Sequence, residues 1–242
     1  MDAVGLVLLA ASVLVGAATQ RITGMGFALV ASPLLVLLLG TATGVSLLLT
    51  LGFVSSVLMI AQLWRAIEVK TAVLLFLPAV VGIVPGEWVA RVLPGPVLSI
   101  VIGGLVGVAI LATVLSERAR VFKGKPGLLS AGFLSGFMNA IAGIGGPAVV
   151  LYALSTEWAH AAFVATIQLY FAGLSAATLV AKGLPQVDAA AWVVAFAALG
   201  VGLVLGNWLS KRVPVEWARR LVIVVALAGA VATIAKGVTG LV

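Results

Sequence analysis

Long uncharged apolar stretches alternate with short charged gaps along the whole chain. The uncharged stretches cover residues 3–20, 22–64, 71–86, 92–116, 126–156, 161–181, 189–210 and 221–235. A helix needs about 20 residues to cross the hydrocarbon core of a membrane. Stretches of this length and polarity therefore predict helices that are embedded in a membrane.

Two of these stretches contain strong helix breakers. The stretch 22–64 is about twice as long as one span, and its natural break is the segment Gly40-Thr41-Ala42-Thr43-Gly44. The segment Ala142-Gly143-Ile144-Gly145-Gly146-Pro147 divides the stretch 126–156, because consecutive glycines and a proline are poor helix interior. The pattern therefore predicts ten helical segments, the first of which ends at Gln20.

The composition excludes a soluble domain. Hydrophobic residues make up 63% and charged residues 9% of the 242 residues, against roughly 45–50% and 25% in soluble domains. The basic residues behind the net charge of +7 sit in short gaps between apolar stretches, which is typical of cytoplasmic loops rather than of a nucleic-acid interface. The chain has no cysteine and one histidine, so no metal site and no other cofactor is predicted.

An internal repeat divides the chain into two halves. Gly82, Gly86, Trp88, Val89, Arg91 and Pro94 recur 120 residues later as Gly202, Gly206, Trp208, Leu209, Lys211 and Pro214. At a shift of 119 residues, Gln20, Gly24 and Gly26 correspond to Asn139, Gly143 and Gly145. We therefore predict one all-α integral membrane domain made of two repeats, residues 1–122 and 123–242, with about five helical segments each.

The first two segments of each half are predicted to form a helical hairpin that enters and leaves on the same side of the membrane. The segment Ala148–Ser155 corresponds to about 12 Å of helix, which is too short to span. With such hairpins the two repeats are inverted, and the glycine-rich turns lie near mid-membrane. If each pair instead crossed the membrane fully twice, the chain would also return to the side from which it entered, and the following helices would have the same orientation as with hairpins. Two full crossings therefore stay open as an alternative.

The distribution of basic residues favours inverted repeats. With hairpins, ten Lys and Arg residues gather on one side and three on the other, whereas a single crossing by each opening pair divides them eight to five. Lys and Arg concentrate on the cytoplasmic side of membrane proteins. The loop Arg118–Lys125 is therefore predicted to be cytoplasmic, and both termini are predicted to lie outside the cytoplasm.

The two glycine-rich turns are candidates for an anion site. Each precedes a short helix whose N-terminus would point into the protein, and the free N–H groups and the dipole of such a terminus attract anions. Glycine lets a ligand approach the backbone closely, and proline suits the first turn of a helix. The candidate backbone contacts are Gly24, Gly26, Gly143, Gly145, Gly146 and Pro147.

Arg21 is the only charged residue in the predicted first hairpin. A guanidinium inside a membrane is costly unless it has a partner, and a bound oxyanion would match its planar fork. Gln20, Thr23 and Asn139 would then donate further hydrogen bonds to the anion. In the alternative interpretation, the hairpin reaches the cytoplasmic face and Arg21 extends to water or lipid phosphate.

Two further polar residues have two interpretations each. Glu87 lies four residues before Arg91 and forms either a simple ion pair along the helix or a protonatable group that couples transport. Its repeat counterpart, Asn207, does not titrate. Gln168 faces either a central cavity, together with Tyr170, or a hydrogen-bonding partner on another helix.

The glycine-rich stretches that open the two halves resemble the pattern of the TauE/SafE-type sulfite exporter family, also called TSUP. They are Gly24-Met25-Gly26-Phe27-Ala28-Leu29-Val30-Ala31-Ser32-Pro33, and Gly132-Phe133-Leu134-Ser135-Gly136-Phe137 followed by Gly143-Ile144-Gly145-Gly146-Pro147. Phe27 and Ala28 stand where glycines are common in the family. The resemblance covers the whole chain and implies export of sulfite, sulfoacetate or a related organosulfonate.

A secondary transporter that moves a small oxyanion outward by alternating access fits these residues best. The sequence has no phosphate-binding G-x-x-x-x-G-K-[ST] motif for ATP, and it lacks the paired carboxylates, H-E-x-x-H motif and cysteine that would indicate an enzyme. A passive small-anion channel and a structural or lipid-interacting membrane protein are the alternatives. The expected partners are the anion, membrane lipids and a second copy in a homodimer, with no nucleic acid, in the inner membrane of a bacterium.

Overall fold

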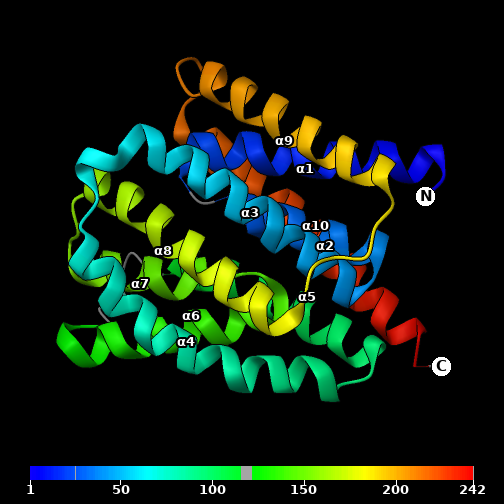
Figure 1. The fold of residues 1–242 in the computed structure, drawn as a ribbon, viewed down its shortest axis with the longest axis horizontal. Coiled ribbons are helices and arrows are strands. Elements are labelled where there is room, and N and C mark those ends of the chain that lie inside the picture. Colours follow the sequence, from blue (N-terminus) through cyan, green and yellow to red (C-terminus); the bar gives the residue numbers. More distant parts are fainter. Residues whose placement is uncertain (25, 116–121, 242) are drawn as a thin grey trace.

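The computed structural model describes residues 1–24, 26–115 and 122–241, and every regular element in these ranges is a helix (Figure 1). The elements are α1 (Ala3–Thr23), α2 (Phe27–Leu39), α3 (Thr41–Leu63), the 3-10 helix η1 (Trp64–Ala66), α4 (Val69–Val92), α5 (Gly95–Leu115), α6 (Gly124–Ala142), α7 (Gly146–Ser155), α8 (His160–Lys182), α9 (Ala189–Leu209) and α10 (Val215–Thr239). The α-helices correspond to the ten predicted segments. Arg118 and Arg120, in the loop predicted to be cytoplasmic, lie outside the described residues.

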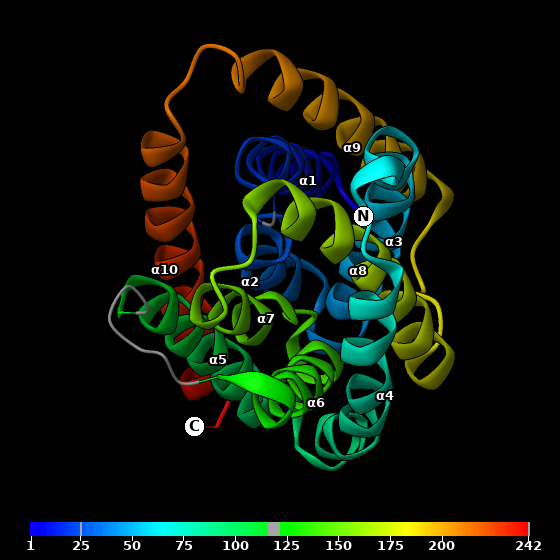
Figure 2. The ribbon, with the colours of Figure 1, turned by 90° about the vertical axis from the view of Figure 1, so that its left-hand side faces the viewer.

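Seven of the described helices are long and apolar enough to cross a membrane. The helices α2 and α7 have only 13 and 10 residues, which correspond to about 20 and 15 Å of helix. Both lie near the centre of the bundle (Figure 2). The prediction of an all-α protein with membrane-spanning helices is therefore confirmed.

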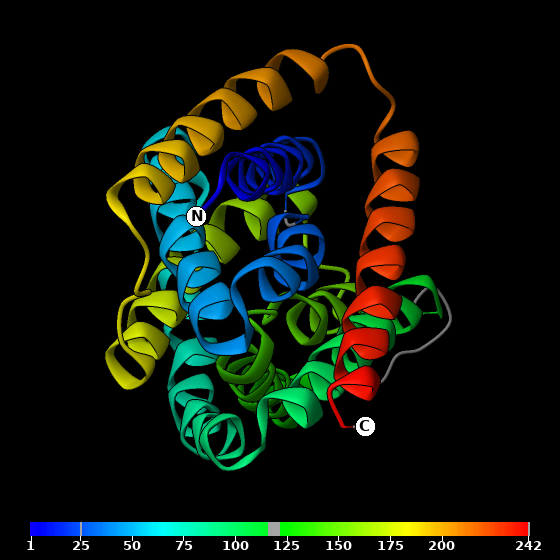
Figure 3. The same cartoon turned by 90° about the vertical axis from the view of Figure 1, so that its right-hand side faces the viewer.

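Both chain termini lie at the same end of the bundle, which we call the terminal end (Figures 1 and 3). Asp188, at the start of α9, accepts hydrogen bonds from the Met1 ammonium and from the N–H of Ala191, both at 2.7 Å. These bonds hold the pKa of Asp188 below its ordinary value. Lys236, in the last turn of α10, donates to the carbonyl of Leu37 near the end of α2. The end of α2 therefore also lies at the terminal end.

The helices α1 and α2, and likewise α6 and α7, form hairpins. Gly16 of α1 lies against Phe27 and Ala31 of α2, so α2 runs back alongside α1. The N–H of Phe122 donates to the Ser155 hydroxyl at 3.3 Å, so α7 returns to the place where α6 begins. The first hairpin has its open side at the terminal end, and the second has it at the opposite end (Figure 1).

The first helix is longer than predicted. It continues through Arg21 to Thr23, because the Arg21 guanidinium has polar partners on other helices, Asn207 and Gln62. Gln62 is the last residue but one of α3, at the opposite end. The first hairpin therefore extends toward the opposite end of the bundle, and a turn near mid-membrane stays a prediction.

The repeated glycines of α9 let it approach α1 closely. An added Cβ at Gly202 would stand 2.7 Å from the carbonyl oxygen of Leu14, and one at Gly206 would stand 2.7 Å from that of Ala18. Small residues allow such backbone contact between helices in a membrane. These glycines therefore serve packing, as expected for a G-x-x-x-G spacing.

The glycines at the corresponding positions of α4 make the same contacts with α6. An added Cβ at Gly86 would stand 2.6 Å from the carbonyl oxygen of Phe137, and one at Gly82 would overlap the carbonyl of Phe133. Phe133 and Phe137 follow the α1 contact residues by 119 positions. Two helix pairs, each with one member from each half, are thus packed by equivalent residues.

Replacing Gly202 with valine is expected to destabilise the protein by about 1–3 kcal/mol or more, because the added atoms overlap the backbone of α1. The loss would be measured as a lower thermal unfolding temperature of the purified protein in detergent. Gly200→Val is the matched control on the same helix, since no atom lies within 4 Å of an added Cβ there. Equal melting temperatures for the two variants would contradict the packing role.

Candidate functional site

The two hairpin turns have the same local geometry. Gly24 and Gly143 end α1 and α6 with φ values of 87° and 70°, in the left-handed region that favours glycine. Their N–H groups donate to the carbonyl oxygens of Gln20 and Asn139 at 2.7 and 2.8 Å. In both halves the next helix begins three residues after this glycine.

Both turns line one central cavity of about 540 Å³. The predicted site residues that line it are Gln20, Thr23, Gly26, Asn139, Gly143, Gly145, Gly146 and Pro147. The two hairpins also touch directly, since the Ser32 hydroxyl of α2 donates to the carbonyl of Ala142 at 2.6 Å. The structure thus brings predicted residues of both halves together in one place.

The central cavity opens at the opposite end of the bundle. Its exposed lining residues are Leu154, Glu157, His160 and Arg219, which lie at the end of α7, at the start of α8 and in the first turns of α10. Among the described lining residues, acidic and basic side chains occur only at this mouth. The interior is therefore lined by backbone, neutral polar groups and apolar side chains.

The N-termini of α2 and α7 reach the central cavity without side-chain caps. Their N-cap residues are Gly26 and Gly145, which have no side chain to bond the first N–H groups, and both line the cavity. The first turn of a helix presents free N–H donors and the positive end of the helix dipole. Two such termini can accommodate an anion in the cavity without a fixed positive charge.

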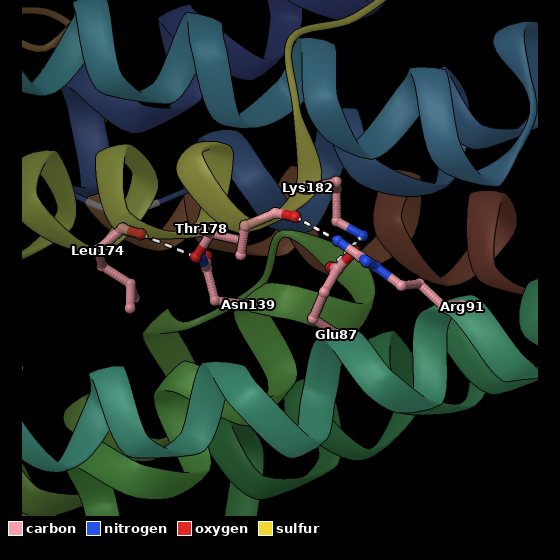
Figure 4. A network of polar contacts seen from close by, with 7 residues as sticks. Glu87, Arg91, Asn139, Leu174, Thr178 and Lys182 are labelled. Carbon is pink, nitrogen blue, oxygen red and sulfur yellow. Dashed lines mark hydrogen bonds and ion pairs between the residues drawn. The ribbon is translucent and has the colours of Figure 1, made fainter.

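Two buried amides add side-chain donors. Gln20 and Asn139 are 4% and 3% exposed. The Ser55 hydroxyl donates to Oε1 of Gln20 at 2.9 Å, which leaves Nε2 of Gln20 as the donor for a ligand. Nδ2 of Asn139 donates to the Thr178 hydroxyl at 2.9 Å, and that hydroxyl donates to the carbonyl of Leu174 (Figure 4). Each amide is thus oriented by a hydroxyl from another helix.

Two serines in the central cavity were not singled out from the sequence. Ser56 of α3 and Ser175 of α8 are buried and line the cavity. They are 119 residues apart, the shift that relates Gln20 to Asn139. Extending the repeat comparison from the turns to α3 and α8 would have identified them.

Gln168 and Gly24 do not line the central cavity. Instead, Nε2 of Gln168 donates to the Gly24 carbonyl at 3.1 Å, so a hydrogen bond between helices is the correct interpretation of Gln168. The Tyr170 hydroxyl donates to Ser135, whose own hydroxyl donates to the carbonyl of Gly145, at 2.7 and 2.6 Å. Gln168 of α8 thus bonds the first turn directly, and Tyr170 of α8 bonds the second turn through Ser135.

Arg21 also lies away from the central cavity. Its guanidinium donates to Oδ1 of Asn207 at 2.9 and 3.2 Å and to Oε1 of Gln62 at 2.8 Å. Successive residues of a helix point about 100° apart, so Arg21 faces α9 and α3 while its neighbour Gln20 faces the cavity. The structure therefore does not bring Arg21 to the predicted anion site, and the alternative of a location near the end of the bundle describes it better.

Replacing Arg21 with alanine is accordingly expected to leave the affinity for anions unchanged and to lower thermal stability modestly, since three hydrogen bonds between helices are lost. Titration calorimetry with sulfoacetate and a thermal melt of the same sample measure the two effects. A tenfold loss of affinity in a protein of unchanged stability would place Arg21 in the binding site after all.

Glu87 lies outside the central cavity and has two cationic partners. Its Oε1 is 3.0 Å from Nε of Arg91, the expected pair along α4, and its Oε2 is 2.8 Å from Nζ of Lys182 in α8 (Figure 4). The second pair was not predicted, because Lys182 is distant in sequence and belongs to the other half. Glu87 therefore joins the two halves at the terminal end.

A family comparison covers almost all of this helical arrangement. The family described as sulfite exporter TauE/SafE matches residues 8–233. The chain belongs to the TauE/SafE sulfite exporter family. No curated protein and no solved structure matches the chain. Because TauE/SafE is a family of transporters, the seven long apolar helices identify a multi-pass membrane transporter.

Proposed function

We propose that the protein is a secondary transporter that exports a small sulfur-containing oxyanion, such as sulfite, sulfoacetate or a related organosulfonate, through the central cavity. The observation that carries this proposal is the convergence of two uncapped helix N-termini, those of α2 and α7, on one cavity. The description of the TauE/SafE family names sulfite, and sulfoacetate and other organosulfonates are proposed as chemically related anions.

The residues that line the central cavity are suited to binding an anion reversibly, as transport requires. Its volume of about 540 Å³ lies in the range of roughly 300–1,000 Å³ that is usual for small-molecule sites. Free N–H groups, the Gln20 amide and the hydroxyls of Ser56 and Ser175 are neutral donors. Such donors favour an oxyanion without a buried opposite charge, so the anion binds and also leaves, as transport requires.

The proposed mechanism is alternating access between two inverted repeats, residues 1–122 and 123–242. Each contact between a helix of the first half and a helix of the second half has an equivalent contact with the halves reversed. The contact of α1 with α9 corresponds to that of α6 with α4, and the contact of α2 with α10 corresponds to that of α7 with α5. The equivalent helices α3 and α8 pack on each other. The two hairpins also enter from opposite ends of the bundle. Inverted repeats with interrupted helices at their interface are typical of secondary transporters.

We place the mouth of the central cavity on the cytoplasmic side of the inner membrane and both termini on the outer side. The mouth lies at the end that carries most of the basic residues, including Arg219, as cytoplasmic loops do. An anion would then enter from the cytoplasm. The membrane potential favours its export by about 2.3 kcal/mol per charge and 100 mV.

Single cysteines at positions 2 and 123 are expected to be labelled from opposite sides of the membrane. The chain contains no cysteine, so each introduced thiol reports its own position. An impermeant maleimide applied to intact cells should label the cysteine at position 2 alone, and labelling of the other should require permeabilised cells. Labelling of both from the same side would contradict the inverted arrangement.

Flux measurements on purified protein in liposomes test the function directly. Sulfite, sulfoacetate and sulfate are loaded on one side, and the initial rate of transport is followed as a function of concentration. A carrier gives a rate that saturates and accelerates exchange when the anion is present on both sides. Flux that stays proportional to concentration would support the alternative of a passive anion channel, and no flux would refute transport of these anions.

A further inference from the structure

A second cavity, of about 300 Å³, lies at the terminal end, across the bundle from the mouth of the central cavity. Its lining includes Thr41, Ala42, Glu87, Arg91, Ile141 and Lys182. Ala42 and Arg91 are exposed, so the second cavity opens at this end. It therefore lies on the side to which the proposed function delivers the anion.

Only the last turn of α6 separates the two cavities along this helix. Asn139 lines the central cavity and Ile141, two residues later, lines the second one. On α8, Thr178 holds Asn139, and Lys182 follows one turn later in the second cavity. Figure 4 shows Asn139 and Thr178 close to the charged cluster of Glu87, Arg91 and Lys182.

The charged cluster in the second cavity contains one carboxylate and two cations. The side chains of Glu87 and Lys182 are 10% and 9% exposed, whereas that of Arg91 is 64% exposed. Glu87 accepts a hydrogen bond from Nε of Arg91 and forms an ion pair with Lys182, so the cluster of one carboxylate and two cations carries a net charge of +1. One further anion would neutralise it, and a sulfonate or sulfite group offers the same kind of oxygen acceptors as the Glu87 carboxylate.

The fold itself does not require this ion pair. At a shift of 120 residues, Glu87 corresponds to Asn207, and Lys182 follows Gln62 by the same interval. Asn207 and Gln62 are neutral and do not bond each other, and Arg21 lies between them. The equivalent helices α9 and α3 are nevertheless in contact. A carboxylate paired with a lysine is therefore specific to the terminal end.

We infer that the cluster of Glu87, Arg91 and Lys182 is a second binding site for the transported anion, at which the anion replaces the Glu87 carboxylate as the partner of Lys182 and Arg91. This inference rests on the proposed function. The replacement also breaks the Glu87–Lys182 ion pair, one of several polar contacts between the halves at the terminal end. Release of the anion then restores the pair.

Single cysteines and a neutral reagent test the second site. Ala42→Cys reports the second cavity and Ser175→Cys reports the central one. The rate of modification by N-ethylmaleimide is measured on purified protein with increasing sulfoacetate, which does not react with the reagent. Both cysteines are expected to be protected. Protection at position 42 should persist in Gly146→Val, whose added side chain covers the N-terminus of α7 in the central cavity. Its loss there would assign the effect to the central cavity and overturn the second site.

The two partners of the ion pair are expected to respond in opposite directions. With Ala42→Cys as reporter, Lys182→Gln should weaken protection about tenfold or more, because a charge-assisted partner of the anion is lost. Glu87→Gln should produce protection at a lower sulfoacetate concentration, because the competing carboxylate is gone. A purely structural ion pair would instead give both variants the same effect, and this result would overturn the inference.

Matched controls separate the outcomes. Lys236→Gln removes another lysine of the terminal end, one that bonds a backbone carbonyl outside the second cavity, and should change nothing. Retained protection of Ser175→Cys shows that each variant is folded. Protection at position 175 without protection at position 42 would refute the second site and leave the proposed function standing. Absence of protection at both would refute both.

Discussion

Glutamate at position 20 is expected to abolish anion binding in the central cavity. Gln20→Glu keeps the shape of the side chain and the hydrogen bond that its oxygen accepts from Ser55, but it replaces the amide N–H₂ that faces a ligand with a second oxygen. A carboxylate would repel the oxyanion instead of donating to it. Loss of the donor alone costs about 1.5–3 kcal/mol with a charged partner, or about 10- to 150-fold in affinity, and the repulsion adds to this.

The matched control for this change is Gln62→Glu. It is the same substitution at an exposed position outside the central cavity, beside the Arg21 guanidinium. The dissociation constant for sulfoacetate, measured by titration calorimetry, should be unchanged in this variant. An equal loss of affinity in both variants would show that the added negative charge acts through the overall potential rather than at the site, and would remove Gln20 from it.

Valine at position 146 is expected to block transport with little loss of stability. Gly146 is the first residue of α7 and lines the central cavity, and the nearest atom to an added Cβ is Cζ of Phe171 at 3.6 Å, an ordinary contact. The side chain therefore fits, but it covers the N-terminus to which the anion would bind. Initial flux into liposomes should fall about tenfold or more, if one charge-assisted donor is lost, and Gly146→Ala should have a smaller effect.

The neighbouring glycine is a poor probe of binding by comparison. Gly145 has φ of −88°, so it is not in the left-handed region, yet an added Cβ would stand 2.8 Å from both Leu174 and the Ser135 hydroxyl. Gly145→Val should thus destabilise the second turn itself. A Gly146→Val protein that melts as low as Gly145→Val would show that position 146 serves packing and not the anion.

The helices and their breaks could be predicted because they depend on local sequence. The glycine and proline clusters at residues 40–44 and 142–147 interrupt apolar stretches, and both break the helix in the structure. The repeat comparison also identified Gly202 and Gly206, whose packing against α1 follows from their size. Local composition and the internal repeat were sufficient for these features.

The partners of the polar side chains could not be predicted from the sequence. Arg21 bonds residues that are 41 and 186 positions away, and Lys182 reaches Glu87 from the other half. The rotation of α1 about its axis depends on how α1 packs against α9. This packing directs Gln20 to the central cavity and Arg21 to α9 and α3. A single helix in a membrane does not determine such a rotation, because its surroundings are apolar on every side.

The central claim is that one small anion binds between the N-termini of α2 and α7, and a structure with selenite tests it most directly. Selenite is the heavier analogue of sulfite, and its anomalous scattering locates it independently of the protein. The account predicts a selenium peak in the central cavity, within hydrogen-bonding distance of Gln20 and of the backbone N–H groups that follow Gly26 and Gly145. A cavity without a peak at saturating selenite, or a strongest peak at Arg21, would contradict it.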